Sequence, residues 1–122
     1  MSKKILVVSS EEDCSIIEKM LSDGEYRITG VKSVNEMKIP SREPPPVIIC
    51  EACTPDGGNW KQVLEAAQEM NGQPLVIVCS EHADEHLWAE VLNLGAYDVL
   101  VKPFEKEEVA RVVEFAVIRK SQ

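Results

Sequence analysis

Short apolar runs alternate with helix-like segments along this chain. Four of them, residues 5–8, 47–50, 75–79 and 99–101, are rich in Val and Ile and contain no polar alternation. Such runs predict parallel strands that are buried on both faces of a sheet. A more polar run at residues 26–31 predicts a fifth strand at an edge of the same sheet.

The segments between these runs have helical spacing. The predicted helices span residues 11–21, 34–38, 59–71, 82–94 and 105–120. Gly95 follows the fourth helix in the position where a left-handed residue usually ends one, and the last helix is acidic in its first turn and basic in its last. Strict alternation of strand and helix predicts a doubly wound α/β domain with helices on both faces of one parallel sheet.

Polar residues follow the predicted strands where their carboxyl ends share one edge, and open α/β folds bind ligands at that edge. These residues are Ser9, Ser10, Glu51, Ser80 and Lys102. Glu51 alone among them is acidic, which argues against the metal and phosphate chemistry common at such an edge.

Composition narrows the function classes. The 122 residues, 44% of them hydrophobic, suit a single domain spanning 1–122. A net charge of -8 argues against contact with nucleic acid or an anionic membrane. The longest apolar run is far shorter than the roughly 20 residues of a membrane span, so we expect a cytoplasmic protein.

The chain as a whole resembles the receiver domain of bacterial two-component response regulators. The resemblance covers nearly the whole chain and is carried by residues 4–8, residues 46–51 with Pro55 and Gly57-Gly58 behind them, Ser80, Gly95-Ala96 and residues 101–104. It implies a flavodoxin-like (βα)5 fold with strand order 2-1-3-4-5 and a signalling role. We therefore expect no enzyme activity and no catalytic residue.

In that family an Asp after the third strand accepts a phosphoryl group, and two acids after the first strand hold Mg²⁺. A Ser or Thr after the fourth strand contacts the phosphate, and a Lys after the fifth neutralises it. Ser80 and Lys102 match these positions, but the acceptor position holds Glu51 and the acidic pair is Ser9 and Ser10. These departures suggest a degenerate receiver, or pseudo-receiver, with weak or absent Mg²⁺ binding and no other cofactor.

Glu51 carries one more methylene than Asp, which shifts the carboxylate by about 1 Å and spoils attack geometry. We expect it instead within salt-bridge reach of Lys102, and the resemblance implies a cis Lys102–Pro103 peptide. The pair is then either a plain structural ion pair or a charge that stands in for the phosphoryl group. For Ser9 and Ser10, helix capping is the favoured interpretation.

The thiols leave a different class of function open. Cys50 and Cys53 form a C-x-x-C pattern, and Cys79 is expected on the neighbouring strand close to Cys50. A small thiol redox or metal-binding protein is therefore an alternative, although Cys50 ends a buried strand, where a thiol is usually inert. His82 and His86 have a spacing that could clamp a metal on a helix, but no third ligand is evident.

The favoured function is a receiver-like module that acts through protein contact without phosphorylation. A receiver that a histidine kinase still phosphorylates by an atypical route is the second interpretation. The resemblance implies contact through the face of the fourth helix, fifth strand and fifth helix, where Val99 replaces an aromatic switch residue. Trp88 is expected to be partly exposed near Val99 and to anchor a homodimer or another protein of a bacterial signalling pathway. Completing the core is the alternative role for Trp88.

Overall fold

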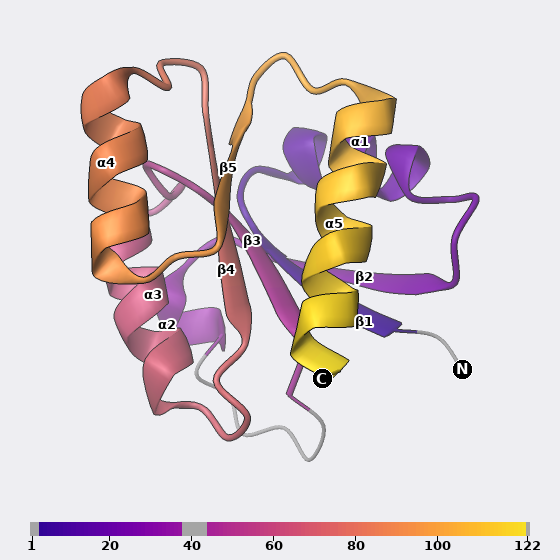
Figure 1. Ribbon diagram of the computed structural model, residues 1–122, viewed down its shortest axis with the longest axis horizontal. Helices are drawn as coiled ribbons and strands as arrows, with labels where there is room; N and C mark the ends of the chain where they lie inside the picture. Colours follow the sequence, from indigo (N-terminus) through magenta and orange to yellow (C-terminus); the bar gives the residue numbers. More distant parts are fainter. Residues whose placement is uncertain (1–2, 38–43, 122) are drawn as a thin grey trace.

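Within residues 3–37 and 44–121, which the computed structural model describes, five strands form one sheet (Figure 1). They are β1 (Lys3–Val8), β2 (Tyr26–Val31), β3 (Val47–Glu51), β4 (Leu75–Ser80) and β5 (Asp98–Val101). All neighbouring strands pair in parallel, in the order β2-β1-β3-β4-β5. The predicted flavodoxin-like fold and strand order are therefore confirmed.

The described residues also form five helices, which cover both faces of the sheet. They are α1 (Glu11–Met20), α2 (Val34–Met37), α3 (Trp60–Glu69), α4 (Glu85–Leu94) and α5 (Lys106–Ser121). Figure 1 shows α1 and α5 on one face and α2, α3 and α4 on the other. This is the doubly wound arrangement that right-handed crossovers between parallel strands produce.

Each face of the sheet has its own hydrophobic core. Successive strand residues point to opposite faces, so Ile5 and Val7 pack under α1 and α5 while Leu6 and Val8 pack under α2, α3 and α4. The central strands are consequently buried throughout, which explains their unbroken apolar sequences. Each buried Val or Ile contributes about 1.5–3 kcal/mol relative to an exposed one.

Side chains define the helix starts, and one predicted start is wrong. Asn59 and Gln62 form a capping box at α3. The fourth helix begins at Glu85 rather than at His82, because the Asp84 side chain accepts a hydrogen bond from the backbone N–H of Leu87 and so caps the first turn. Gly95 ends this helix with a φ of 98°, in the left-handed region that favours glycine.

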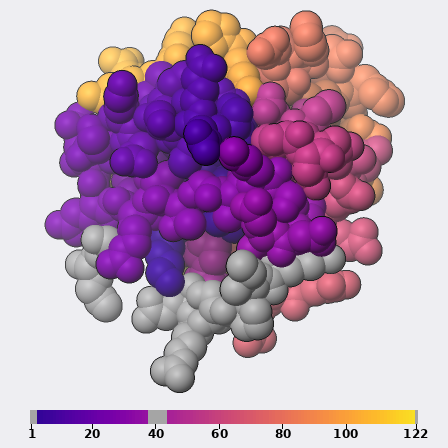
Figure 2. Space-filling model, turned by 180° about the vertical axis from the view of Figure 1, so that it is seen from behind, coloured from indigo at the N-terminus to yellow at the C-terminus, as the bar shows by residue number. Residues whose placement is uncertain are grey.

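The sheet is viewed from its β5 edge in Figure 1, with α4 and α5 at the front. From behind, the first third of the chain forms most of the surface, so the β2 edge lies on the far side of the molecule (Figure 2). The predicted end of the second helix at Lys38 lies outside the described residues. No helix in the described part of the chain combines the length and apolar character that a membrane crossing requires.

Candidate functional site

Four side chains at the carboxyl edge of the sheet form a closed polar ring. The Lys102 ammonium donates to Glu51 Oε1 at 2.6 Å and to Asp13 Oδ2 at 2.5 Å. The Ser9 hydroxyl lies 2.8 Å from Asp13 Oδ2 and 3.0 Å from Glu51 Oε2. Each member therefore contacts two others, and the ring joins segments that are far apart in the sequence.

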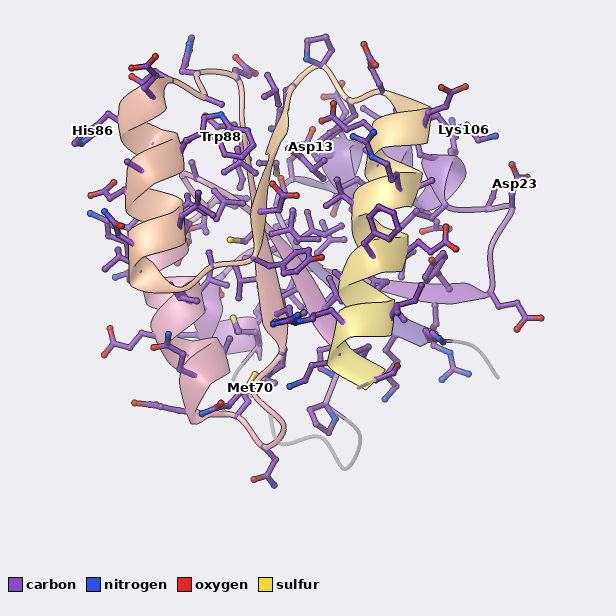
Figure 3. The ribbon with its side chains drawn as sticks, viewed as in Figure 1. Asp13, Asp23, Met70, His86, Trp88 and Lys106 are labelled. Carbon is purple, nitrogen blue, oxygen red and sulfur yellow. The ribbon has the colours of Figure 1, made fainter. Side chains whose placement is uncertain are left out.

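Different elements supply the four groups. Ser9 directly follows β1 and is 3% exposed, Glu51 is the last residue of β3, and Lys102 directly follows β5. Asp13 lies in the first turn of α1, and Figure 3 shows it close to the chain that leads from β5 to α5. The ring thus ties α1 to three strand ends.

The ring is largely shielded from solvent. Side-chain exposure is 10% for Lys102, 14% for Asp13 and 27% for Glu51. Burial by itself disfavours the charged form of Lys102, but hydrogen bonds to Asp13 and Glu51 outweigh it and raise the lysine pKa well above its usual range. With one ammonium and two carboxylates, the ring has one formal negative charge in excess.

Two geometric predictions are confirmed. Glu51 lies within direct salt-bridge distance of Lys102, without an intervening water. The Lys102–Pro103 peptide is cis.

The prediction that Ser9 and Ser10 cap the first helix is confirmed for Ser10 and wrong for Ser9. Ser10 is the N-cap of α1, and its hydroxyl accepts a hydrogen bond from the backbone N–H of Asp13. Ser9 does not cap the helix, because its hydroxyl is turned inward to the two carboxylates of the ring.

Ser80 lies at the same sheet edge but outside the ring. Its hydroxyl accepts a hydrogen bond from the backbone N–H of His82, and so supports the loop between β4 and α4. Its backbone carbonyl accepts from the backbone N–H of Lys102, which aligns the end of β5 with the end of β4. Of the expected phosphate-site pair, the structure joins only Lys102 to the acidic groups.

Asp13 is the functional residue that sequence reasoning missed. Attention to residues directly after the strands singled out Ser9 and Ser10, whereas Asp13 lies one helical turn beyond Ser9. Ser9 directly precedes the N-cap Ser10, so the first turn of α1 brings the Asp13 carboxylate back to the Ser9 hydroxyl at the sheet edge. That spacing is the signal that could have identified it.

Hydrogen bonds fix the conformation of the loop after Glu51. The backbone N–H of Ala52 donates to the carbonyl of Cys79, and the backbone N–H of Trp60 donates to the carbonyl of Ala52. Thr54 is buried, and its hydroxyl donates to Asp56 Oδ1 at 2.5 Å. These bonds give the β3–α3 connection a defined shape beside the ring.

The cysteines do not form a shared site. Cys79 lies on the strand next to Cys50 as predicted, but the two side chains enter opposite cores, while Cys53 is exposed. Burial raises the pKa of Cys79 to about 12 and that of Cys50 well above its usual value. His82 precedes α4, so it shares no helical face with His86, and no group of three or more His, Cys, Asp or Glu side chains in the described residues could hold a metal.

Two further residues were expected to matter for partner contact. Val99 is 3% exposed and belongs to the core under α2, α3 and α4. Trp88 is half-buried and packs against the same core, and Figure 3 shows its indole on the side of α4 that faces β5.

Comparison with known proteins adds a family to this geometry. The model of the response regulator receiver domain matches residues 5–114. The hybrid signal transduction histidine kinase D of Dictyostelium discoideum is 26% identical over 122 residues, which make up 97% of this chain and 8% of that kinase. The chain therefore spans only a small part of the curated relative it matches.

Solved structures share the fold. A signal receiver domain from Vibrio parahaemolyticus has a TM-score of 0.86 at 22% identity, with 99% of this chain and 94% of that one covered. The signal receiver domain of an HD domain-containing protein from Pseudomonas fluorescens has a TM-score of 0.83 at 18% identity, with 99% and 98% covered. At these identities the likeness concerns the fold alone.

Proposed function

The chain belongs to the response regulator receiver family, and from that premise we propose that it is a two-component signalling module whose phosphorylation site is occupied by its own side chains. The observation that carries this proposal is the double engagement of Lys102. In the family this lysine neutralises a phosphoryl group, whereas here its ammonium is bound by Glu51 and Asp13. A carboxylate of the protein thus supplies the negative charge that phosphorylation would bring.

Electrostatics opposes a second anion at this position. The ring already has one negative charge in excess, and a phosphoryl group would add further negative charge beside the Asp13 and Glu51 carboxylates. At an effective dielectric constant of 20, two like charges 4 Å apart repel by about 4 kcal/mol. A phosphoryl donor would also have to displace Asp13 from Lys102, which removes a hydrogen bond between charged groups.

The donor set does not suit Mg²⁺ either. This ion requires oxygen ligands in an octahedral shell and normally uses one or two carboxylates. Ser9 and Ser10 are neutral, and both carboxylates of the ring are already bound to Lys102. We therefore expect Mg²⁺ to bind weakly or not at all, and no step of the proposed function involves it.

The test is incubation of the protein with acetyl phosphate and Mg²⁺, followed by intact-mass measurement. We expect no phosphoprotein, while a receiver with the usual acidic residues in the same buffer provides the positive control. A stoichiometric adduct on Glu51 that is stable to acid and labile to base would overturn the proposal and favour the atypical phosphorylated receiver.

We further propose that the module acts through the surface of α4, β5 and α5. Every large hydrophobic side chain that is exposed in the described residues belongs to one of these three elements, which lie together at the front of Figure 1. They are Leu92, Leu94, Val101, Phe115 and Ile118. Exposed apolar groups gathered on one side are typical of a protein contact surface.

Trp88 can anchor such a contact only through the part of its ring that is not in the core. Val99 has no aromatic ring, so we expect no switch through an aromatic residue in β5.

Because Trp88 packs against the core, Trp88→Ala would lower the stability of the fold as well as the affinity for a partner. Leu92→Ser changes a side chain that is 57% exposed and is the cleaner variant for measuring loss of association with a partner.

The alternative of a thiol redox or metal-binding protein has less support than the signalling module. A thiol redox or metal function is not favoured, because Cys50 and Cys79 lie on opposite faces of the sheet and Cys53 is separate from both. The cytoplasmic location, the single-domain extent and the absence of nucleic acid and membrane partners stay predictions.

A further inference from the structure

A cavity of about 470 Å³ lies between the end of α1, the start of β2 and one side of α5. Lys106, Ala110, Glu114 and Val117 line it from α5, and their spacing of three or four residues places them on the same side of that helix. Cavities that bind small molecules in proteins have volumes of roughly 300–1,000 Å³. This cavity is therefore large enough for an organic molecule, and none of its lining residues belongs to the polar ring.

The cavity has an apolar floor. Leu21 and Val117, which are each 3% exposed, close it toward the core, and the half-buried Met20 lies beside them. Ala110 contributes only a methyl group, so a larger side chain at this position would fill the space between α1 and α5. The floor can thus accept the apolar part of a ligand.

Tyr26 forms one wall, and its ring packs directly against Gly24. A Cβ atom on Gly24 would lie 2.5 Å from Cε2 of the ring, so only glycine allows this close approach. The phenol is half-buried, yet its hydroxyl forms no hydrogen bond with any residue in the described part of the chain. Tyrosine hydroxyls usually have a partner when they are buried, so this one is available to a polar group of a ligand.

Acidic groups outnumber basic ones around the cavity. The charged residues that line it are two cations and three carboxylates, namely Lys3, Asp23, Glu25, Lys106 and Glu114. Lys106 and Asp23 neutralise each other in an exposed ion pair of 2.8 Å, and Figure 3 shows both side chains on the same side of the molecule. Glu114 forms no ion pair with another described residue. Its charge is therefore available to a cation.

The Glu114 carboxylate acts on the Tyr26 phenol. Burial raises the pKa of Tyr26, and the negative charge of Glu114 raises this pKa further. The phenol consequently keeps its proton at neutral pH and stays uncharged. The cavity thus places an aromatic ring with a hydroxyl group beside a carboxylate, above an apolar floor.

We propose that this cavity binds a small aromatic amine, with its ammonium group at Glu114 and its ring against Tyr26 and the apolar floor. A carboxylate beside a phenol ring attracts a cation through its own charge and through the electrons of the aromatic face. An anionic ligand of the same size would meet an excess of negative charge. The inference goes beyond the proposed function and does not depend on it.

The experiment is an NMR titration of the full chain, labelled with ¹⁵N, with tryptamine as the probe. We expect saturable shifts of the amide signals of Gly24, Tyr26 and Glu114, with a Kd on the order of 1 mM, which is typical of a molecule of this size. Indole-3-propionic acid has the same ring and the opposite charge. It should bind about tenfold more weakly, because it cannot form the charged hydrogen bond to Glu114.

Variants separate the cavity from the overall charge of the chain. Glu114→Gln should raise the Kd of tryptamine by about tenfold. The matched control is Glu107→Gln, which makes the same charge change at an exposed position of α5 that does not line the cavity, and it should leave the Kd unchanged. Ala110→Leu fills the cavity with a good helix former and should abolish the saturable shifts while urea unfolding still shows a folded chain.

Three results would overturn the inference. The first is the absence of saturable shifts at these amides. The second is an equal effect of Glu114→Gln and Glu107→Gln, which would mean that tryptamine is attracted only by the net charge of -8. The third is a folded Ala110→Leu variant that binds tryptamine normally. None of these results bears on the occupation of the phosphorylation site, which the acetyl phosphate experiment tests separately.

Discussion

The ammonium nitrogen of Lys102 lies 2.5 Å from Oδ2 of Asp13, a residue 89 positions earlier in the chain. This contact binds the first turn of α1 to the connection between β5 and α5. Because the same ammonium also binds Glu51 at the end of β3, one side chain holds three parts of the fold together. The carboxyl edge of the sheet is therefore cross-linked by charge.

Asp13→Asn should lower the free energy of unfolding by about 1.5–3 kcal/mol, the usual range for losing a hydrogen bond to a charged group. The amide keeps the size of the side chain but cannot neutralise Lys102. Urea unfolding measures the change. Glu12→Gln, at an exposed position one residue earlier in the same turn, should have little effect. Equal effects of the two variants would show that the Lys102 contact contributes no specific stability.

Lys102→Met should cost more, about 3 kcal/mol, because it leaves two shielded carboxylates without their cation. The matched control is Lys106→Met, which removes an exposed ion pair with Asp23 at 2.8 Å (Figure 3). Exposed pairs contribute little to stability, so the control should unfold almost as the unchanged chain does. If thermal and urea unfolding rank the two variants in the opposite order, the ring is not a significant cross-link.

The fold could be predicted from the sequence because both faces of the central strands are buried. That requirement produces unbroken apolar runs such as 47–50. Because these short strands alternate with helical segments, only a few sheet topologies are compatible with the sequence. The start of α4 was misplaced because the pattern of apolar residues does not distinguish His82 from Asp84. The helix begins after Asp84 because the Asp84 side chain accepts a hydrogen bond from the backbone of the first turn.

The site was predicted in part, for a physical reason. Glu51 ends β3 and Lys102 directly follows β5, with β4 between the two strands, so parallel pairing alone brings both residues to one edge of the sheet. Asp13 reaches the same edge from a helix, and its direction depends on where that helix begins and how it packs. Ser9 was misread for the same reason, since its role depends on the Asp13 carboxylate four residues later.

Native thiol chemistry should distinguish the cysteines. Cys53 is exposed and should react quickly with a disulfide reagent, whereas Cys50 and Cys79 are buried with raised pKa values and should react only after unfolding. Cys14 is half-buried with a raised pKa and should react more slowly than Cys53. A thiol count in buffer and in denaturant measures these differences, and Cys53→Ala should abolish the fast phase. Rapid reaction at Cys50 or Cys79 in the folded protein would contradict the packing described above and reopen a redox function.

The last prediction concerns alkaline pH. Burial raises the pKa of Cys79 from 9.0 to about 12 in the folded protein. Below pH 9 the thiol keeps its proton in both states, so its contribution to stability is fully present. Above pH 9 the unfolded chain ionises while the folded one does not, and the free energy of unfolding falls until the folded pKa is reached.

Between pH 9 and pH 10 this single thiol should remove about 1 kcal/mol of stability. Cys79→Ala should therefore show a shallower loss over that interval than the unchanged chain, with a reductant present to prevent disulfides. The interval lies below 10.5, the ordinary lysine pKa, so the raised pKa of Lys102 affects stability only at higher pH. Cys53→Ala, at an exposed position, should keep the original slope. Identical pH slopes for Cys79→Ala and the unchanged chain would mean that Cys79 ionises as easily in the folded protein as in the unfolded one, which burial in the α1–α5 core does not permit.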